Sequence, residues 1–175
     1  MMSNPIQPTV IKPKSLARTV ELLSGAFASG EVGASDAAHL KLTEIHQRPS
    51  VAFLRVAYRY LPERWENQTR PWMAITSGIA WMSPRSHQGG LSVGQVLAEH
   101  GYSETRFERL LSADPTIFPM LLVRTAYFLA TKQTPVDWIE FAHLALEQDQ
   151  VELERIRMTI ARDFYRPRSI RHKRI

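Results

Sequence analysis

The segment Gly89–Asp114, GGLSVGQVLAEHGYSETRFERLLSAD, constrains the fold of this chain more than any other stretch. It predicts two short helices around one tight turn. Ser92 is suited to cap the first helix, because a serine hydroxyl can accept a hydrogen bond from a free amide at a helix start. Gly101 is suited to end that helix, since glycine adopts the left-handed cap conformation without strain. Ser103 then opens a second helix, which has an apolar side and an arginine-bearing side.

Helical periodicity also dominates the rest of the 175 residues. No alternating apolar run is joined to another by a hairpin turn, so strands are not expected. Ser35 and Asp137 are plausible N-caps, and Asp114-Pro115 marks a turn. The patterns predict an all-α protein of two small packed helical bundles with about eight or nine helices. The expected helices are Ser15–Ala28, Ser35–Gln47, Ser50–Tyr60, Thr69–Met82, Ser92–His100, Ser103–Leu111, Thr116–Lys132, Asp137–Glu147 and Gln150–Tyr165.

Composition divides the chain into four parts. Residues 1–14 hold three prolines and few large apolar groups, and we expect a flexible N-terminal segment there. Residues 15–88 and 89–166 are expected to form an N-terminal and a C-terminal helical bundle, with their boundary at the loop Ser83–Gly90. Residues 167–175 form a basic tail.

The absence of cysteine excludes disulfides, thiolate metal sites and a cysteine nucleophile. No apolar run reaches the roughly 18 residues that a membrane-spanning helix needs. The N-terminus also lacks a charged start followed by an apolar signal region. These features lead us to expect a cytoplasmic protein that does not bind membranes.

The basic residues favour a nucleic-acid partner. Arginine outnumbers lysine by 17 to 5, and the net charge is +5. Arginine binds phosphate through two parallel hydrogen bonds and stacks on bases; a GC-rich genome would also enrich it. Residues 1–149 contain 14 basic and 14 acidic side chains, whereas residues 150–175 contain eight basic and three acidic ones. The whole net charge therefore lies in the last helix and the tail.

The last expected helix has two distinct sides. At about 100° per residue, Arg155, Arg162 and Arg166 lie within about 20° of one line. Apolar side chains gather on the opposite side: Leu153, Ile156, Ile160 and Phe164. The helix should therefore dock through one face and expose an arginine ridge on the other. Such a ridge is either a solvated helix face or a phosphate-binding surface.

Arg124 lies within MLLVRTAYFLA, an otherwise apolar helix. A buried guanidinium without a partner would be very costly. Arg124 must therefore pair with a carboxylate inside the protein or reach out to a partner, and the sequence by itself favours internal pairing.

No catalytic constellation is recognisable, because glycine-rich phosphate loops, HExxH and GxSxG are all absent. His39 and His46 could share a helix face, as could Glu140, His143 and Glu147, but solvated polar faces are commoner than metal sites. We therefore expect no metal, no cofactor and no small-molecule substrate. Tryptophans can stack on bases, although most are expected to anchor the core here. The four are Trp65, Trp72, Trp81 and Trp138.

The turn Gly-Leu-Ser-x-Gly-x-x-Leu-Ala-x-x-Gly at 90–101, the short basic helix after it and the Ala-Asp at 113–114 resemble the CasB family. CasB is the small subunit of the type I-E CRISPR surveillance complex, Cascade. The resemblance continues through Arg124 and Val136-Asp137-Trp138, extends more weakly back to Trp65-Glu66-Asn67, and covers residues 15–165. It implies a non-catalytic subunit, of which two copies lie between the large subunit and the backbone subunits. They help to hold the RNA–DNA heteroduplex and the displaced strand of the R-loop.

The resemblance also implies site residues and partners. Nucleic-acid contacts fall on Arg106 and Arg124 and, less directly, on Arg70. The family's basic cluster is replaced here by Glu-Gln-Asp-Gln at 147–150, and nearby arginines one or two turns later are possible substitutes. The implied partners are other Cascade subunits, a second copy of the chain, CRISPR RNA (crRNA) and target DNA. The candidate nucleic-acid-binding residues are Arg70, Arg106, Arg109, Arg124, Arg155, Arg157, Arg162, Arg166 and Arg168.

Two other functions fit parts of the sequence. The helices around Gly101, with Arg106 and Arg109 on the second, can imitate the helix-turn-helix of a transcription regulator. That second helix is short for a recognition helix. A small helical nuclease is the other alternative, but the sequence offers no clustered carboxylate or histidine set for it.

Overall fold

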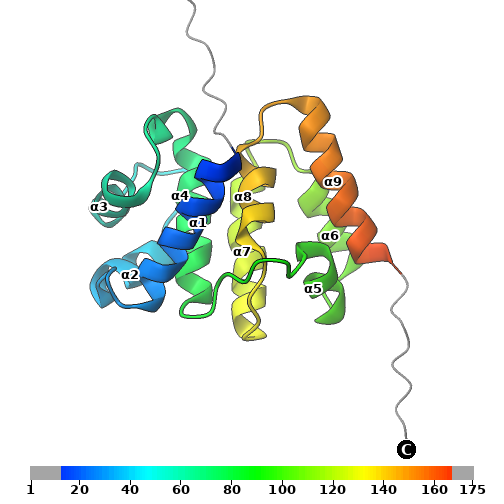
Figure 1. Cartoon of the computed structure of the whole chain (residues 1–175), viewed down its shortest axis with the longest axis horizontal. Helices are drawn as coiled ribbons and strands as arrows, with labels where there is room; N and C mark the ends of the chain where they lie inside the picture. Colours follow the sequence, from blue (N-terminus) through cyan, green and yellow to red (C-terminus); the bar gives the residue numbers. More distant parts are fainter. Residues whose placement is uncertain (1–12, 167–175) are drawn as a thin grey trace, which may run out of the picture.

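The computed structural model describes residues 13–166 and confirms the all-α prediction, because this range contains nine α-helices, one 3₁₀-helix and no strand (Figure 1). The elements are α1 Pro13–Ala28, α2 Ala34–Lys41, α3 Val51–Tyr60, η1 Trp65–Gln68, α4 Thr69–Met82, α5 Val93–Glu99, α6 Glu104–Ser112, α7 Phe118–Thr131, α8 Trp138–Leu146 and α9 Gln150–Tyr165.

Local capping explains several of the observed helix ends. The Ser103 hydroxyl accepts a hydrogen bond from the Arg106 N–H at 3.3 Å, so the predicted cap of α6 is confirmed. The Asp137 carboxylate accepts from the Ile139 N–H at 2.9 Å and caps α8 as predicted. Gly101 has a φ of 77°, the left-handed conformation expected of a glycine after α5.

Two predictions about α2 are wrong. The helix begins directly after Gly33, so Ser35 lies inside its first turn rather than capping it. It ends at Lys41 rather than at Gln47, and the chain then turns so that Ile45 enters the core. At this end the Lys41 carbonyl accepts from the Trp81 indole N–H at 3.0 Å in place of a helical N–H.

α4 lies at the centre of the core, and every residue from 72 to 80 is buried. It packs most extensively against α7 and also contacts α1, α2 and α8. Gly78 allows the close approach of α8, because a Cβ at this position would lie 2.3 Å from Cη2 of Trp138. An apolar helix surrounded by other helices is expected to be hydrophobic on all sides, as α4 is.

The expectation that most tryptophans anchor the core is confirmed. Trp72 and Trp138 are fully buried, and Trp65 is 5 % exposed. Trp81 is half-buried at the edge of α4, where its indole N–H donates to the Lys41 carbonyl at 3.0 Å.

Figure 1 shows α1–α4 on one side of the molecule, α5, α6 and α9 on the other, and α7 and α8 between them. Both sides pack on the middle pair, since α4 contacts α7 and α8 while α6 contacts α7 and α9 contacts α8. The division into bundles at 15–88 and 89–166 stays a prediction. No helix within residues 13–166 is long and apolar enough to cross a membrane.

The loop between α4 and α5 is fastened to the start of α8. Besides capping Ile139, the Asp137 carboxylate accepts from the Gly90 N–H at 3.2 Å. The His87 Nδ1 atom accepts from the Trp138 N–H at 3.1 Å. Asp137 therefore serves both as a helix cap and as the anchor of a long connection.

Asp137→Ala is expected to lower the free energy of unfolding by about 1–2 kcal/mol, because the variant loses an N-cap. Loss of the Gly90 contact adds to this effect. Asp137→Asn is the matched control, since its amide oxygen can keep the cap on Ile139 and only the Gly90 contact is lost, so it should cost less than alanine. Urea unfolding of both variants checks the prediction, and equal stability of the two would contradict it.

Candidate nucleic-acid interface

α9 carries the arginine ridge that the sequence predicts. Leu153 and Ile160 are buried against the rest of the protein, while Arg155 and Arg162 are exposed on the other side of the helix. Arg166, the residue that follows α9, is exposed as well. The two-sided arrangement of this helix is therefore confirmed.

Most ridge arginines already have carboxylate neighbours. The Arg155 Nη1 lies 2.9 Å from the Glu152 Oε1, and the Arg162 Nη2 lies 3.1 Å from the Asp163 Oδ1. Exposed ion pairs of this kind contribute little to stability, so a phosphate can replace the carboxylate at small cost. Within residues 13–166, Arg166 forms no ion pair.

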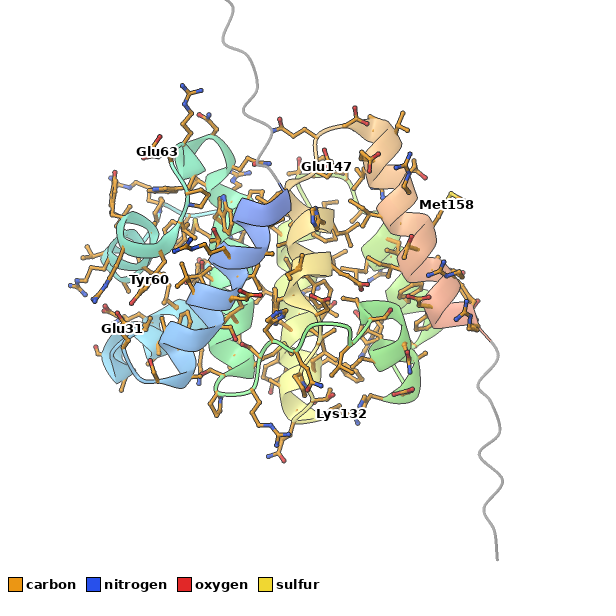
Figure 2. The ribbon with its side chains drawn as sticks, viewed as in Figure 1. Glu31, Tyr60, Glu63, Lys132, Glu147 and Met158 are labelled. Atoms are coloured by element: carbon orange, nitrogen blue, oxygen red, sulfur yellow. The ribbon has the colours of Figure 1, made fainter. Side chains whose placement is uncertain are left out.

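The outer face of α9 is also partly apolar. Val151 is 69 % exposed and Met158 is 70 % exposed. Figure 2 shows Met158 projecting from the outer side of α9, away from the body of the protein. The ridge is thus a mixed surface rather than a purely basic one.

α6 directs two arginines outward. Its capped start places Phe107 and Leu110 in the core. Arg106 and Arg109 are both exposed. Neither forms an ion pair within the described residues, so both guanidinium groups can bind a phosphate.

The location of Arg124 corrects the interpretation that the sequence favoured. Arg124 lies in the middle of α7 but is exposed, and it has no ion pair within residues 13–166. Internal pairing with a buried carboxylate is therefore wrong. The side chain faces outward from an otherwise apolar helix, as a partner contact requires.

Sequence reasoning also missed the neighbours of Arg124. Met120, Arg124 and Tyr127 are all exposed and follow the spacing of one helix face. The ring of Tyr127 meets Trp81 edge to face at a centroid distance of 4.8 Å. The spacing of these three residues along the sequence indicates that they share a helix face. It does not indicate that this face is exposed, because the helix is apolar on its other sides as well.

Arg70 and Arg157 come from distant parts of the chain and line the same cavity, whose volume is about 520 Å³. Arg70 is exposed at the start of α4. Arg157 is paired with Glu154 at 2.7 Å, and 26 % of its side chain is exposed. Of the nine predicted residues, Arg168 lies outside the part of the chain that the structure describes.

Two carboxylates hold the start of α5 against α8 and α9. The Val93 N–H donates to the Glu140 Oε2 at 2.8 Å, and the Ser92 hydroxyl donates to the Asp163 Oδ2 at 2.7 Å. Burial raises the pKa of Glu140, and the neighbouring carboxylates add to this shift. Burial acts in the same direction on Asp163, but hydrogen bonds from Ser92 and Arg162 and nearby positive charge outweigh it and lower the pKa of Asp163. The prediction that the Ser92 hydroxyl caps α5 is wrong, although Ser92 occupies the N-cap position.

Glu140→Gln is expected to become more stable relative to the wild type as the pH rises above the ordinary glutamate pKa of 4.5. A folded-state pKa above the unfolded value favours folding only at low pH, and this contribution is lost as the pH rises through the folded pKa. The amide oxygen of the variant can still accept from Val93 but never ionises. Thermal unfolding of both proteins from about pH 4 to about pH 7 checks this, and a difference that does not change with pH would contradict it.

The histidines predicted to share a face show no metal cluster. Among residues 13–166, no group of three or more histidine, aspartate or glutamate side chains could hold a metal ion. The Nδ1 atom of His39 instead lies 2.7 Å from the Ser35 carbonyl oxygen. Glu140, the first member of the other proposed set, is engaged by the backbone of α5.

Comparison with known protein families gives a match over most of the chain. The sequence matches the family described as CRISPR-associated protein Cse2 over residues 36–165, which is more than half of the chain. A comparison with curated proteins gave no significant match. The chain therefore belongs to the Cse2 family, the CasB small subunits of the type I-E CRISPR surveillance complex Cascade.

Proposed function

We propose that this Cascade subunit binds the backbone of nucleic acids without reading their sequence and stabilises the R-loop between crRNA and target DNA. The observation that carries the proposal is a set of five exposed arginines with no ion pair inside residues 13–166, distributed over α4, α6, α7 and the end of α9. These residues are Arg70, Arg106, Arg109, Arg124 and Arg166.

The chemistry of these side chains supports backbone binding. A guanidinium binds phosphate through two parallel hydrogen bonds, and phosphate contacts position a protein without specifying bases. R-loop formation is a near-balanced exchange of one duplex for another, so a few backbone contacts can shift it. No catalytic step is needed for this role.

The proposed partners follow from membership of the complex. We infer contacts with other Cascade subunits, with a second copy of the chain, and with crRNA and target DNA in the cytoplasm. The subunit would act structurally, without turnover, and without a cofactor or small-molecule substrate.

The purified chain is expected to bind unrelated DNA and RNA sequences with similar affinity. With five phosphate contacts, raising the salt concentration from about 50 mM to about 200 mM should weaken binding by roughly two to three orders of magnitude, because condensed counterions are released on binding. Gel-shift titrations at the two ionic strengths test this.

Two results would contradict the proposal. A preference for one sequence by more than about a hundredfold would favour a helix-turn-helix regulator. Cleavage of nucleic acid with magnesium or manganese, if abolished by His39→Ala or Glu44→Ala, would indicate a nuclease. The sequence-preference titration and the cleavage assay both use the same purified chain as the gel shifts.

A further inference from the structure

The cavity that contains Arg70 and Arg157 is formed by three separate parts of the chain. Its walls come from the end of η1 with the start of α4, the connection between α6 and α7, and the stretch from the end of α8 to the first half of α9. Figure 2 places Glu147 at this end of the molecule, where α8 passes into the loop before α9. The volume of about 520 Å³ lies within the range of roughly 300–1,000 Å³ that is typical of sites for small organic ligands.

The lining of the cavity combines an apolar floor with an amide rim. Pro71, Leu111 and Phe118 contribute apolar surface. Exposed amide side chains stand around them, namely Asn67, Gln148 and Gln150. Within the described part of the chain these three amides form no side-chain hydrogen bond, so their donors and acceptors are free for a ligand. A nucleobase has this combination of flat apolar faces and hydrogen-bonding edges.

Two arginines contribute to the lining of the cavity. Arg70 is exposed and forms no ion pair within residues 13–166. The Arg157 Nη1 is bound to Glu154, but its Nε is shielded from solvent and has no hydrogen-bond partner.

Glu147 is the acidic residue of the lining, and its carboxylate is held by the backbone. One oxygen of Glu147 accepts from the backbone N–H groups of Gln148 and Asp149, both at 2.9 Å. This carboxylate is therefore tied to the loop between α8 and α9. A ligand with a planar ring and a phosphate fits this lining, because the ring can lie on the apolar residues, its edge can bond to the amides, and the phosphate can bind an arginine.

We propose that the cavity holds one unstacked nucleotide of a single-stranded nucleic acid, with the base on the apolar floor and its phosphate at Arg70. This inference rests on the proposed backbone binding and adds a preference to it. Bases in a duplex are stacked and paired, so only a single strand can place a base here. The subunit should therefore bind the displaced strand of an R-loop more tightly than a duplex with the same number of phosphates.

The test compares a 20-nucleotide thymidine strand with an abasic strand of equal length, which keeps the phosphates and removes the bases. The full-length wild-type chain should bind the thymidine strand about tenfold more tightly. Ala113→Trp fills the cavity from the α6 end and should remove this difference, because Ala113 lines it. Gln148→Trp covers the exposed rim and provides a second variant should the first fail to fold. Ala38→Trp, on the exposed side of α2, is the matched control and should keep the difference.

Each outcome decides the question. Equal, salt-dependent affinity of the wild type for both strands would overturn the base pocket and leave backbone binding standing, whereas no binding to either strand would overturn backbone binding as well. Retention of the difference in both folded cavity variants would locate the base elsewhere and reject the proposal. If those variants also failed to assemble with Cascade, the cavity would be a protein-docking site instead.

Discussion

Alanine at Gly94 is expected to destabilise the protein by more than about 3 kcal/mol, at or above the usual upper limit for overpacking. Gly94 is buried in α5, and a Cβ there would lie 2.1 Å from the Ile160 carbonyl oxygen and 2.8 Å from the Phe164 amide nitrogen. Both atoms belong to the backbone of α9 and cannot rotate away. The two helices would have to separate along one of the closest packing surfaces in the fold.

For a chain of this length, 3 kcal/mol corresponds to a fall in Tm of roughly 6–12 °C. Calorimetry measures the fall, and Gly25→Ala is the matched control. A Cβ at Gly25 meets no atom within 4 Å, so alanine there should be neutral or slightly stabilising in α1. Similar Tm values for Gly94→Ala and Gly25→Ala would contradict the close approach of α5 and α9.

The consequence of Gly94→Ala for nucleic-acid binding is separate from its effect on stability. α9 carries Arg155 and Arg162, whereas Arg106 and Arg124 lie on α6 and α7. A variant that loosens only α9 should lose part of its affinity for nucleic acid and keep the contribution of the other helices. Gel shifts below the Tm of the variant measure that partial loss.

The helices were predictable because most of their ends are encoded locally. Ser103 and Asp137 cap the helices that follow them, and Gly101 supplies a positive φ. The predictions were wrong where a distant residue takes over a local role. The first amide of α5 is satisfied by Glu140 from α8, which leaves the Ser92 hydroxyl free to donate to Asp163.

The candidate interface was only partly predictable. Periodicity identified the exposed side of α9, because charged and apolar residues alternate clearly there. In α7 the pattern is apolar on nearly all sides, and only the packing against α4 determines that Arg124 faces outward. The cavity was not predictable at all, since Arg70 and Arg157 line one cavity only when five helices converge.

Simultaneous replacement of Arg70, Arg106, Arg109 and Arg124 by alanine is expected to weaken nucleic-acid binding by about a thousandfold. Each lost phosphate contact should cost on the order of 1 kcal/mol, and separate exposed side chains act nearly additively. The slope of log affinity against log salt should fall by about 0.7–0.9 for each contact. Because all four side chains are exposed and form no ion pair within residues 13–166, the Tm of the free protein should change little.

The control for this variant must remove the same charge from another surface. Alanine at Arg18, Arg48, Arg55 and Arg59 does so, and the last two side chains are already paired with Asp36 and Glu31. If binding depended only on net charge, both quadruple variants would lose affinity equally. A large loss confined to the first variant would instead locate binding on α4, α6 and α7. In assembled Cascade that variant should lose affinity for target DNA but retain the guide RNA, because we expect the backbone subunits to hold it.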